Sequence, residues 1–327
     1  MKRTKTSVLL EWQKTGNKPL VLLGARQVGK TFLIRQFAQD AFQNHHYFNF
    51  EEQLGLSRVF EKSLKVQDMI FELELVANTK ILETDLIIFD EIQAVPAAIT
   101  SLKYFAEDKK YKVIAAGSLL GVKLNTASFP VGKVQIEHLS PMTFSEFLMN
   151  AHPFAFERYI SISDSKQLHG ALHDKLVEIY LHYLFVGGLP EAVLCYIDMA
   201  NSGLERWQKV RQVQQNLIKS YQADFAKHSG SVNALHLASV WNDCARQIGQ
   251  TQNDSVQRFR FQGVLPGKKQ FSQFENVFHW LQKSSLIIKT YLVEKPEIPL
   301  SAYIKNSLFK AFIFDVGILN ALFQISA

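Results

Sequence analysis

Cysteine is scarce in this sequence: the 327 residues include only Cys195 and Cys244, each in an apolar setting. Two cysteines cannot build a disulfide framework, and no cysteine–histidine spacing typical of a zinc site accompanies them. We therefore interpret both residues as reduced core thiols of a cytosolic protein.

Long hydrophobic runs are also missing. The basic N-terminus is followed by the apolar run 8–10, which ends at Glu11. That run is too short for the apolar region of a signal peptide. No stretch approaches the roughly 18 uninterrupted apolar residues of a spanning helix. The sequence therefore predicts a soluble, cytoplasmic protein without a membrane partner.

Charge of one sign is not in large excess. The formal net charge is +6, with 20% charged and 47% hydrophobic residues, as in an ordinary soluble protein. A net charge of this size permits nucleic acid as a partner without requiring it. The chain contains no internal repeat or low-complexity tract, and its length predicts two or three domains.

The first 150 residues alternate short apolar runs with helix-like segments. We expect strands over 19–23, 46–50, 86–89, 113–116 and 134–138, and helices over 7–13, 31–39, 66–77, 99–105 and 143–150. Strands that alternate with helices predict an α/β fold whose parallel sheet is covered on both faces. Wholly apolar strands fit that burial.

Beyond residue 150 helical segments dominate. Residues 165–228 are expected to be helical with one break at 187–190, and 232–284 add further helices. A strand over 286–292 and a hairpin near Lys295 complete the element order of a winged helix. We divide the chain into a P-loop α/β domain (1–150), a helical lid (151–230), a winged-helix-like domain (231–300) and the start of a C-terminal module (301–327).

A phosphate-binding motif follows the first apolar run. Residues 24–31 read Gly-Ala-Arg-Gln-Val-Gly-Lys-Thr, which fits G-x-x-x-x-G-K-[ST] at every fixed position. The glycines let backbone N–H groups surround phosphates, and the following helix adds its positive N-terminal end. Lys30 is expected to reach the β- and γ-phosphates of ATP, and the Thr31 hydroxyl to bind Mg²⁺. The predicted nucleotide-binding residues are Gly24, Ala25, Arg26, Gln27, Val28, Gly29, Lys30, Thr31 and Phe32.

The alternative for this motif is a glycine-rich turn without a ligand. Its position directly after an apolar strand and directly before a helix favours the P-loop interpretation.

Two acidic residues follow a later apolar strand. The run 86–89 leads into Asp90 and Glu91, which is the Walker B pattern of P-loop proteins. Asp90 is expected to hold Mg²⁺ through water, and Glu91 to act as the general base. The alternative is a buried strand with a solvated acidic end. A base beside the metal ligand predicts hydrolysis of ATP rather than binding alone.

The apolar strand 113–116 leads into Gly117 and Ser118. The Ser118 hydroxyl is a candidate sensor of the γ-phosphate or the attacking water, and we group it with Glu91 and Lys30 as catalytic. A serine that only caps a helix or a turn is the alternative.

The ordered motifs resemble those of the bacterial and archaeal AAA-type ATPases that join a P-loop domain to a winged-helix and nuclease-like region. The matching segments are 24–31, 89–93, 116–121, 129–134, 140–148, 186–193, 224–228 and 309–319. The resemblance implies that Gly187, Gly188 and Pro190 lie beside the nucleotide base; the alternative is a simple helix break. For Lys133 it implies phosphate sensing, with a solvated surface lysine as the alternative.

The resemblance also implies a nuclease-like module after 309–319, with a metal-binding carboxylate and a Glu-x-Lys pair. This sequence stops at Ala327, so we expect that module to be absent or barely begun. The apolar tail 309–325 is then expected to lack the surface on which it would pack.

Two histidines are weak candidates for a metal site. His169 and His173 are four residues apart on a predicted helix, so they share a face. Neither the glutamate of a metalloprotease motif nor a third ligand accompanies them. We do not expect metal binding there.

A basic and aromatic segment is a candidate for DNA contact. Arg258, Arg260, Lys268 and Lys269 lie near phenylalanines, a combination that occurs in nucleic-acid-binding proteins. However, the predicted recognition helix, 271–282, is poor in basic residues. The alternative is a winged helix that packs on the ATPase core.

Two functions therefore stay open. The first is an ATPase whose hydrolysis of ATP drives a conformational change, with nucleic acid as a potential target. The second is an ATP-dependent switch without turnover that holds a protein partner through the winged helix. A homo-oligomer is compatible with both.

Overall fold

The protein forms two compact units in the computed structural model: an N-terminal unit, Lys2–Ser140, and a C-terminal unit, Pro141–Ala327 together with Met1. The structure describes residues 1–61, 63–118, 120–123, 129–130, 132–162, 170–229, 231–250 and 258–324. Each unit has a hydrophobic core of its own.

The N-terminal unit is built on a five-stranded sheet in the order β2-β3-β4-β1-β5, and every pairing in it is parallel. Its strands are β1 (Leu20–Leu23), β2 (His45–Asn49), β3 (Leu86–Asp90), β4 (Lys112–Ala116) and β5 (Gln135–His138). The inner strands β1 and β3 are buried at every position and are apolar except for Asp90 at the end of β3, whereas exposure alternates along the edge strands β2 and β5. The predicted α/β fold with a parallel sheet is confirmed.

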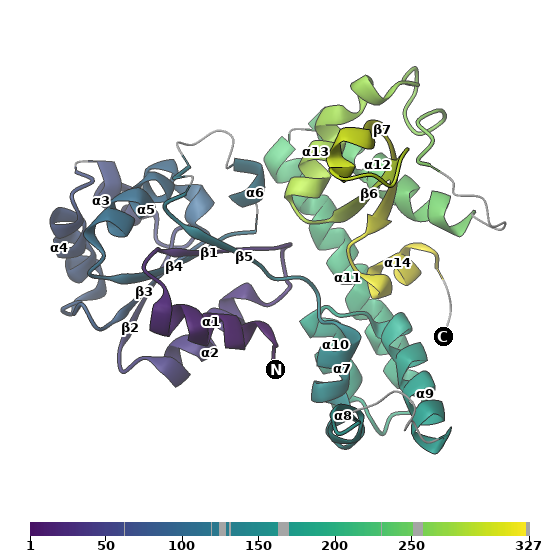
Figure 1. Cartoon of the computed structure of the whole chain (residues 1–327), viewed down its shortest axis with the longest axis horizontal. Helices are drawn as coiled ribbons and strands as arrows, with labels where there is room; N and C mark the ends of the chain where they lie inside the picture. The colour runs from purple at the N-terminus through teal and green to yellow at the C-terminus, as the bar shows by residue number, and fades with distance from the viewer. Residues whose placement is uncertain are drawn as a thin grey trace. The chain divides into compact units, whose positions relative to one another are not determined.

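Helices lie on both faces of this sheet. They are α1 (Lys5–Thr15), α2 (Lys30–Ala41), α3 (Ser57–Glu61), α4 (Val66–Ala77), α5 (Pro96–Asp108) and α6 (Leu120–Lys123). Figure 1 shows α1 and α2 on one face and α3, α4 and α5 on the other. Under the second group, four phenylalanine rings surround Phe89 at centroid distances of 5.5–6.2 Å. This aromatic packing fixes β3 immediately before Asp90.

The strand order determines which loops meet. Strand β4 lies between β1 and β3, and parallel strands present their carboxyl ends at one edge of a sheet. The segments that follow β1, β4 and β3 therefore come together there. Those segments contain the predicted P-loop, Ser118 and the predicted acidic pair.

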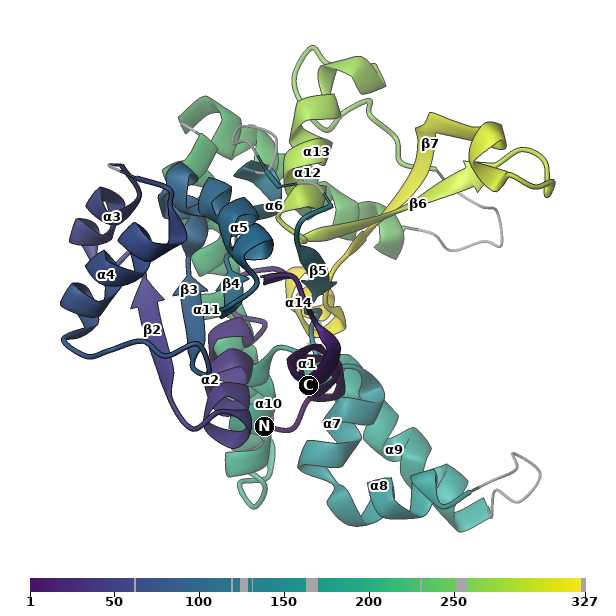
Figure 2. The same cartoon turned by 60° about the vertical axis from the view of Figure 1, so that its left-hand side comes forward.

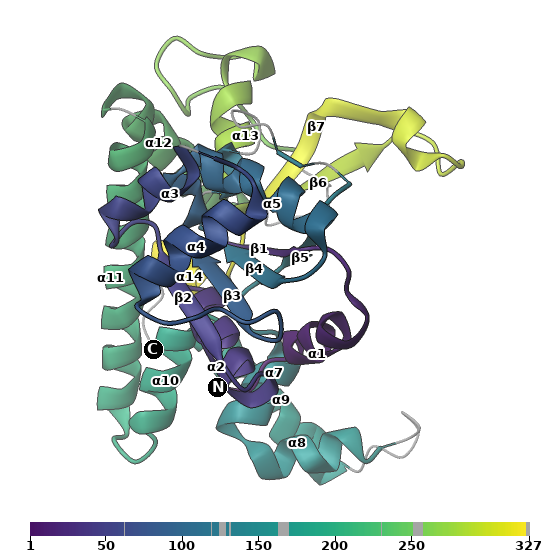
Figure 3. The same cartoon turned by 90° about the vertical axis from the view of Figure 1, so that its left-hand side faces the viewer.

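The C-terminal unit begins with helices α7 (Phe144–Ala151), α8 (Pro153–Ile160), α9 (Gly170–Val186), α10 (Pro190–Asp198), α11 (Leu204–Ser229) and α12 (Ser231–Gly249). The long helix α11 contacts α10, α12 and α14 (Figure 3). The predicted break at 187–190 is confirmed. The expectation of a single break is wrong, because α10 ends at Asp198 and the chain turns through Gly203, whose φ is +51°.

The unit continues with α13 (Glu275–Lys283), the strands β6 (Ile287–Val293) and β7 (Ile304–Ile313), and α14 (Val316–Leu322). β6 and β7 form an antiparallel hairpin, which is seen along its length in Figure 2. β7 lies beyond residue 300, where the sequence analysis placed the end of the winged-helix-like domain. The further division of this unit into a lid and a winged helix stays a prediction.

The apolar C-terminal tail does have a surface to pack against, and the expectation that it lacks one is wrong. Phe309, Ile313 and Ile318 are buried, and α14 contacts α9 and α11. The carboxylate of Asp315 caps α14 by accepting a hydrogen bond from the Ile318 N–H. Among the described residues, no helix combines the length and apolar character needed to cross a bilayer.

Candidate nucleotide-binding site

The loop between β1 and α2 has the backbone of a phosphate-binding turn. Gly24, Gln27 and Gly29 have φ values of +153°, +63° and +93°, which turn successive peptide units in a way that a simple β–α connection does not require. A Cβ on Gly24 would lie 2.2 Å from the carbonyl oxygen of Leu139. Only glycine fits there, because β5 ends directly against the loop.

Arg3 holds this loop in place. Its guanidinium donates to the carbonyl oxygens of Val28 at 3.0 Å and Ser140 at 2.5 Å, and its side chain is buried. In the sequence Arg3 is only one of several basic residues at the N-terminus. Its role depends on contacts 25 and 137 residues away, which no local pattern signals.

Lys30 is the first residue of α2 and lies inside the loop. Its Nζ donates to the carbonyl oxygens of Gly24 at 3.0 Å and Ala25 at 2.8 Å, and its side chain is only 6% exposed. Burial lowers the pKa of Lys30 to about 8, although the nearby carboxylates of Glu91 and Asp90 act in the opposite direction. The ammonium group is thus poorly solvated, and an anion in the loop would interact with it strongly.

Asp90 is buried at the end of β3 and is bound through both carboxylate oxygens. Oδ2 accepts a hydrogen bond from the Thr31 hydroxyl at 2.7 Å, and Oδ1 accepts one from the backbone N–H of Glu91 at 3.0 Å. The predicted metal ligands Thr31 and Asp90 are thus in direct contact, although 59 residues separate them. A carboxylate beside a hydroxyl is the oxygen-rich environment that Mg²⁺ requires.

Tyr47 on β2 is a further partner of Asp90 that the sequence analysis missed. Its hydroxyl donates to Oδ2 at 2.8 Å, and the guanidinium of Arg35 lies 3.9 Å from the centre of its ring. Burial and the Asp90 carboxylate raise the pKa of Tyr47 to about 12. The hydroxyl therefore stays protonated and donates throughout the physiological range.

Glu91 follows in a left-handed backbone conformation, with φ +50°. Its Oε2 accepts a hydrogen bond from the side-chain amide of Gln93 at 2.5 Å, and the Ser118 N–H and hydroxyl approach it at 3.3 and 3.4 Å. A Cβ on Gly117 would lie 1.9 Å from Oε1 of Gln93. Glycine at 117 therefore leaves the space in which Gln93 holds Glu91.

The structure thus brings together most of the predicted site. The P-loop, Lys30, Thr31, Asp90, Glu91 and Ser118 share one edge of the sheet, and their chemistry fits a magnesium–nucleotide complex. Within the loop, Ala25 and Val28 are buried, Arg26 is half-buried and Gln27 is exposed. The Phe32 side chain is 55% exposed. The roles of these residues stay predictions.

Gly188 and Pro190 lie in the C-terminal unit. The carbonyl oxygen of Gly188 accepts from Met142 N–H at 2.7 Å, and its N–H donates to Oδ2 of Asp315 at 2.7 Å. A Cβ on Gly188 would lie 2.1 Å from the Met142 carbonyl oxygen, and Pro190 is at the start of α10. These contacts favour the structural alternative for this motif. A place beside the nucleotide base stays a prediction.

Lys133 also has a local partner. Its ammonium group lies 3.3 Å from a carboxylate oxygen of Glu107, and about half of each side chain is exposed. This geometry is that of a surface ion pair, and phosphate sensing by Lys133 stays a prediction.

The histidine pair offers no evidence of a metal site. His169 lies outside the described residues, and the exposed His173 is 3.4 Å from its neighbour Asp174. Within the part of the chain that the structure describes, no group of three or more His, Cys, Asp or Glu side chains has a metal-binding arrangement.

Comparisons with known proteins bear on both units. Residues 16–148 match the family model of an AAA domain, which spans the P-loop, the acidic pair and the Ser118 strand. The N-terminal unit is an AAA-type P-loop ATPase domain. Residues 177–327 match the model of a domain of unknown function, and no curated protein matches the chain.

Solved structures with the same fold include the Walker-type ATPase PABY2304 of Pyrococcus abyssi. It shares 17% identity with this protein over 99% of this chain and 96% of its own, with a TM-score of 0.59. DnaA of Aquifex aeolicus bound to AMPPCP matches at 13% identity over 74% of this chain and 78% of its own, with a TM-score of 0.37. Only the first score is high enough to show a shared fold.

Proposed function

We propose that this protein binds ATP with Mg²⁺ and hydrolyses it to drive a conformational change. In this proposal the P-loop amides and Lys30 bind the phosphates, and Thr31 and Asp90 hold the metal. Glu91 accepts a proton from the attacking water, and Ser118 contacts the same carboxylate from the neighbouring strand.

The position of Glu91 carries this proposal. A nucleotide switch needs only the phosphate-binding loop and a metal ligand. Here a second carboxylate lies next to the metal ligand, and Gln93 and Ser118 converge on its Oε2. Hydrogen bonds that orient a carboxylate beside a phosphate-binding loop are what a general base for hydrolysis requires.

Each remaining part of the site has a defined task. Thr31 and Asp90 would hold Mg²⁺, which would neutralise charge on the phosphates. Lys30 adds a poorly solvated positive charge, and Tyr47 helps to orient the Asp90 carboxylate by donating to the same oxygen as Thr31. Water positioned by Glu91 is the nucleophile, so the reaction releases inorganic phosphate and ADP.

Steady-state release of phosphate tests the proposal. Wild-type protein is compared with Lys30→Ala in Mg-ATP, and binding is followed separately with a fluorescent ATP analogue. Phosphate release that requires Mg²⁺ and Lys30 supports an ATPase. Binding without release would instead favour the ATP-dependent switch without turnover.

The lowered pKa of Lys30 predicts that nucleotide affinity depends on pH. Only the ammonium form attracts phosphate, and the free protein loses this form as the pH rises through about 8. Mg-ATP affinity is expected to stay constant near neutrality and then to fall about tenfold per pH unit above that value. Titration of a fluorescent ATP analogue between about pH 7 and about pH 9.5 measures this.

Lys30→Arg is the matched control, because a guanidinium keeps its charge over this range. The affinity of this variant for Mg-ATP is expected not to change with pH, even if it is weaker than that of the wild type at every pH. A wild-type affinity that also remained level would show that Lys30 is protonated throughout or does not contact the phosphates.

Tyr47→Phe is expected to raise the Mg²⁺ concentration needed for half-maximal nucleotide binding about tenfold, as is typical when a residue that orients a metal ligand loses its hydrogen bond. The phenyl ring keeps the packing against Arg35, so the change isolates the hydroxyl. Titrating Mg²⁺ at fixed nucleotide gives the value, with Tyr104→Phe on α5 as control. An equal effect of both variants would show that the Tyr47 hydroxyl does not support the metal site.

For the C-terminal unit we propose a lid over 151–230 and a winged-helix-like fold for the elements after it. The order α12, α13, β6, β7 supports that fold, and β7 extends it past residue 300. Nucleic acid, a protein partner or a second copy of the chain is the proposed target of the ATPase cycle, in the cytoplasm.

A further inference from the structure

The hairpin of the C-terminal unit carries a groove of about 970 Å³ on its open side. The strands place Thr290 opposite Lys310, and Ile288 opposite Phe312. Because side chains alternate along a strand, β7 directs the buried Phe309 towards its other face, although Phe309 also borders the groove. The groove therefore lies on the face of the hairpin that the described residues leave exposed, and its floor is partly apolar.

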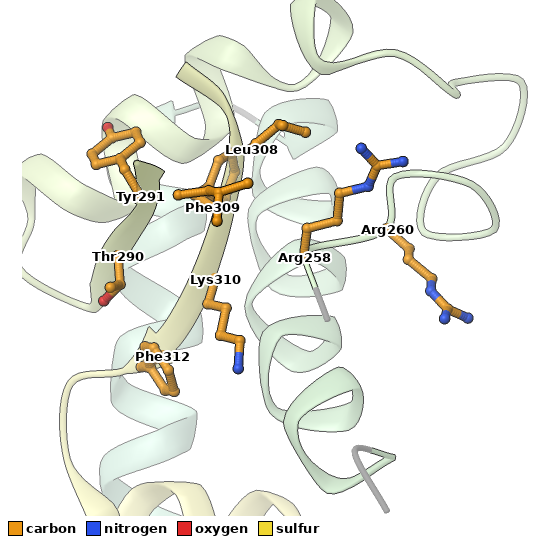
Figure 4. A pocket seen from close by; sticks show the side chains of 9 residues that line it. Arg258, Arg260, Thr290, Tyr291, Leu308, Phe309, Lys310 and Phe312 are labelled. Atoms are coloured by element: carbon orange, nitrogen blue, oxygen red, sulfur yellow. The ribbon is translucent and has the colours of Figure 1, made fainter. Parts of the chain in front are cut away.

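A second segment adds two arginines to this face. The N–H of Phe259 donates to the carbonyl oxygen of Phe309 at 2.8 Å, and the two rings are nearly parallel at 6.1 Å. Phe259 is 5% exposed, so its neighbours Arg258 and Arg260 lie on the open side, where both are exposed. Figure 4 shows the two arginines and Lys310 on the same side of β7.

These three cations are unopposed within the described part of the protein. The residues that line the groove include no aspartate or glutamate, and no described carboxylate lies within salt-bridge distance of Arg258, Arg260 or Lys310. Beside them, the Phe312 ring is half-buried and Ile288 is 55% exposed. The groove thus offers positive charge along an apolar and aromatic floor.

We propose that this groove binds single-stranded nucleic acid. Arg258, Arg260 and Lys310 contact successive phosphates, and a base stacks on Phe312 with the aliphatic side chains beside it. Basic groups that contact the phosphate backbone, together with an aromatic ring on which any base can stack, are typical of proteins that bind single strands. In a paired duplex the faces of the bases are stacked on one another, so they are not available to contact Phe312 or the apolar floor.

The proposal extends the nucleic-acid part of the proposed function, yet it requires no ATP hydrolysis. It also differs from the surface expected from the sequence. Lys268 and Lys269 do not line the groove, while Lys310 and Phe312 come from a segment some 50 residues further on. The hydrogen bond from the Phe259 N–H to the Phe309 carbonyl oxygen brings that segment beside the arginines.

Binding of a labelled single strand of about 15 nucleotides to the full chain tests the proposal, without ATP or Mg²⁺ and with DNA and RNA strands in separate arms. Each phosphate contact adds about 0.7 to the slope of log affinity against log salt. Arg258→Ala/Arg260→Ala/Lys310→Ala is therefore expected to weaken binding and to reduce the slope by about 2. Phe312→Ala is expected to weaken binding about tenfold and leave the slope unchanged.

The matched control, Lys268→Ala/Lys269→Ala/Lys283→Ala, removes the same charge from outside the groove. Weak binding by the groove variant together with near wild-type binding by the control supports the proposal. Three results would overturn it: no binding by the wild type, equal losses in both triple variants, or binding of duplex DNA or a polyglutamate peptide as tight as that of the single strand. Phosphate release by the groove variant is expected to be unchanged. A failure of the strand-binding proposal can therefore be distinguished from a failure of the ATPase proposal.

Discussion

Glu91→Gln is expected to lower phosphate release by a factor of about 10² to 10⁴, the usual contribution of a positioned general base. Affinity for Mg-ATP should stay near that of the wild type. Glutamine keeps the size of the side chain and can accept the hydrogen bond from Gln93, but it cannot take a proton from water. A single-turnover assay with matched nucleotide binding measures both quantities.

Glu72→Gln on α4 is a suitable control, because its side chain is only half-buried and lies on a helix that does not carry the site. It should hydrolyse ATP as the wild type does. If Glu91→Gln also kept the wild-type rate, the base would have to be another group. The rate of phosphate release by Gln93→Ala is expected to lie between those of Glu91→Gln and Glu72→Gln. This variant loses the hydrogen bond that orients the Glu91 carboxylate but keeps the carboxylate itself.

Whether a residue of the site could be predicted from the sequence depends on how far away in the sequence its partners lie. The P-loop could be predicted because its eight residues are consecutive and the chemistry fixes their types. Asp90, Glu91 and Ser118 could be predicted because each directly follows an apolar strand. Tyr47 and Arg3 could not, because a tyrosine in an alternating strand and an arginine near the N-terminus are ordinary until the fold places them against Asp90 and the loop.

The same distinction holds for the fold. Burial on both faces makes β1, β3 and β4 apolar at nearly every position, so the sheet could be read from local pattern. The C-terminal tail could not, because its partners lie far back in the chain. The close approach of Gly187 to Asp315 and Gly317 and the hydrogen bond from the Gly188 N–H to Asp315 are decided by long-range packing, which the sequence did not reveal.

That long-range packing leads to a second large effect: Asp315→Ala is expected to lower the free energy of unfolding of the C-terminal unit by about 2–4 kcal/mol. The buried carboxylate accepts from the Gly188 N–H at 2.7 Å and the Ile318 N–H at 2.9 Å. Alanine would leave both donors inside the protein without an acceptor. Burial raises the pKa of Asp315 to about 6, so the carboxylate is ionised at the slightly alkaline pH chosen for the measurement.

Denaturant titration followed by tryptophan fluorescence measures this loss, since Trp207, Trp241 and Trp280 all lie in the C-terminal unit. The exposed Asp174→Ala is the control and should change stability by less than about 0.5 kcal/mol. Asn320 donates to the Leu184 carbonyl oxygen at 2.6 Å, and Asn320→Ala is expected to cost about 1 kcal/mol. This milder variant probes the attachment of α14 to α9 if Asp315→Ala does not fold. Losses no larger than that of Asp174→Ala in both variants would mean that α14 contributes little to the stability of the unit.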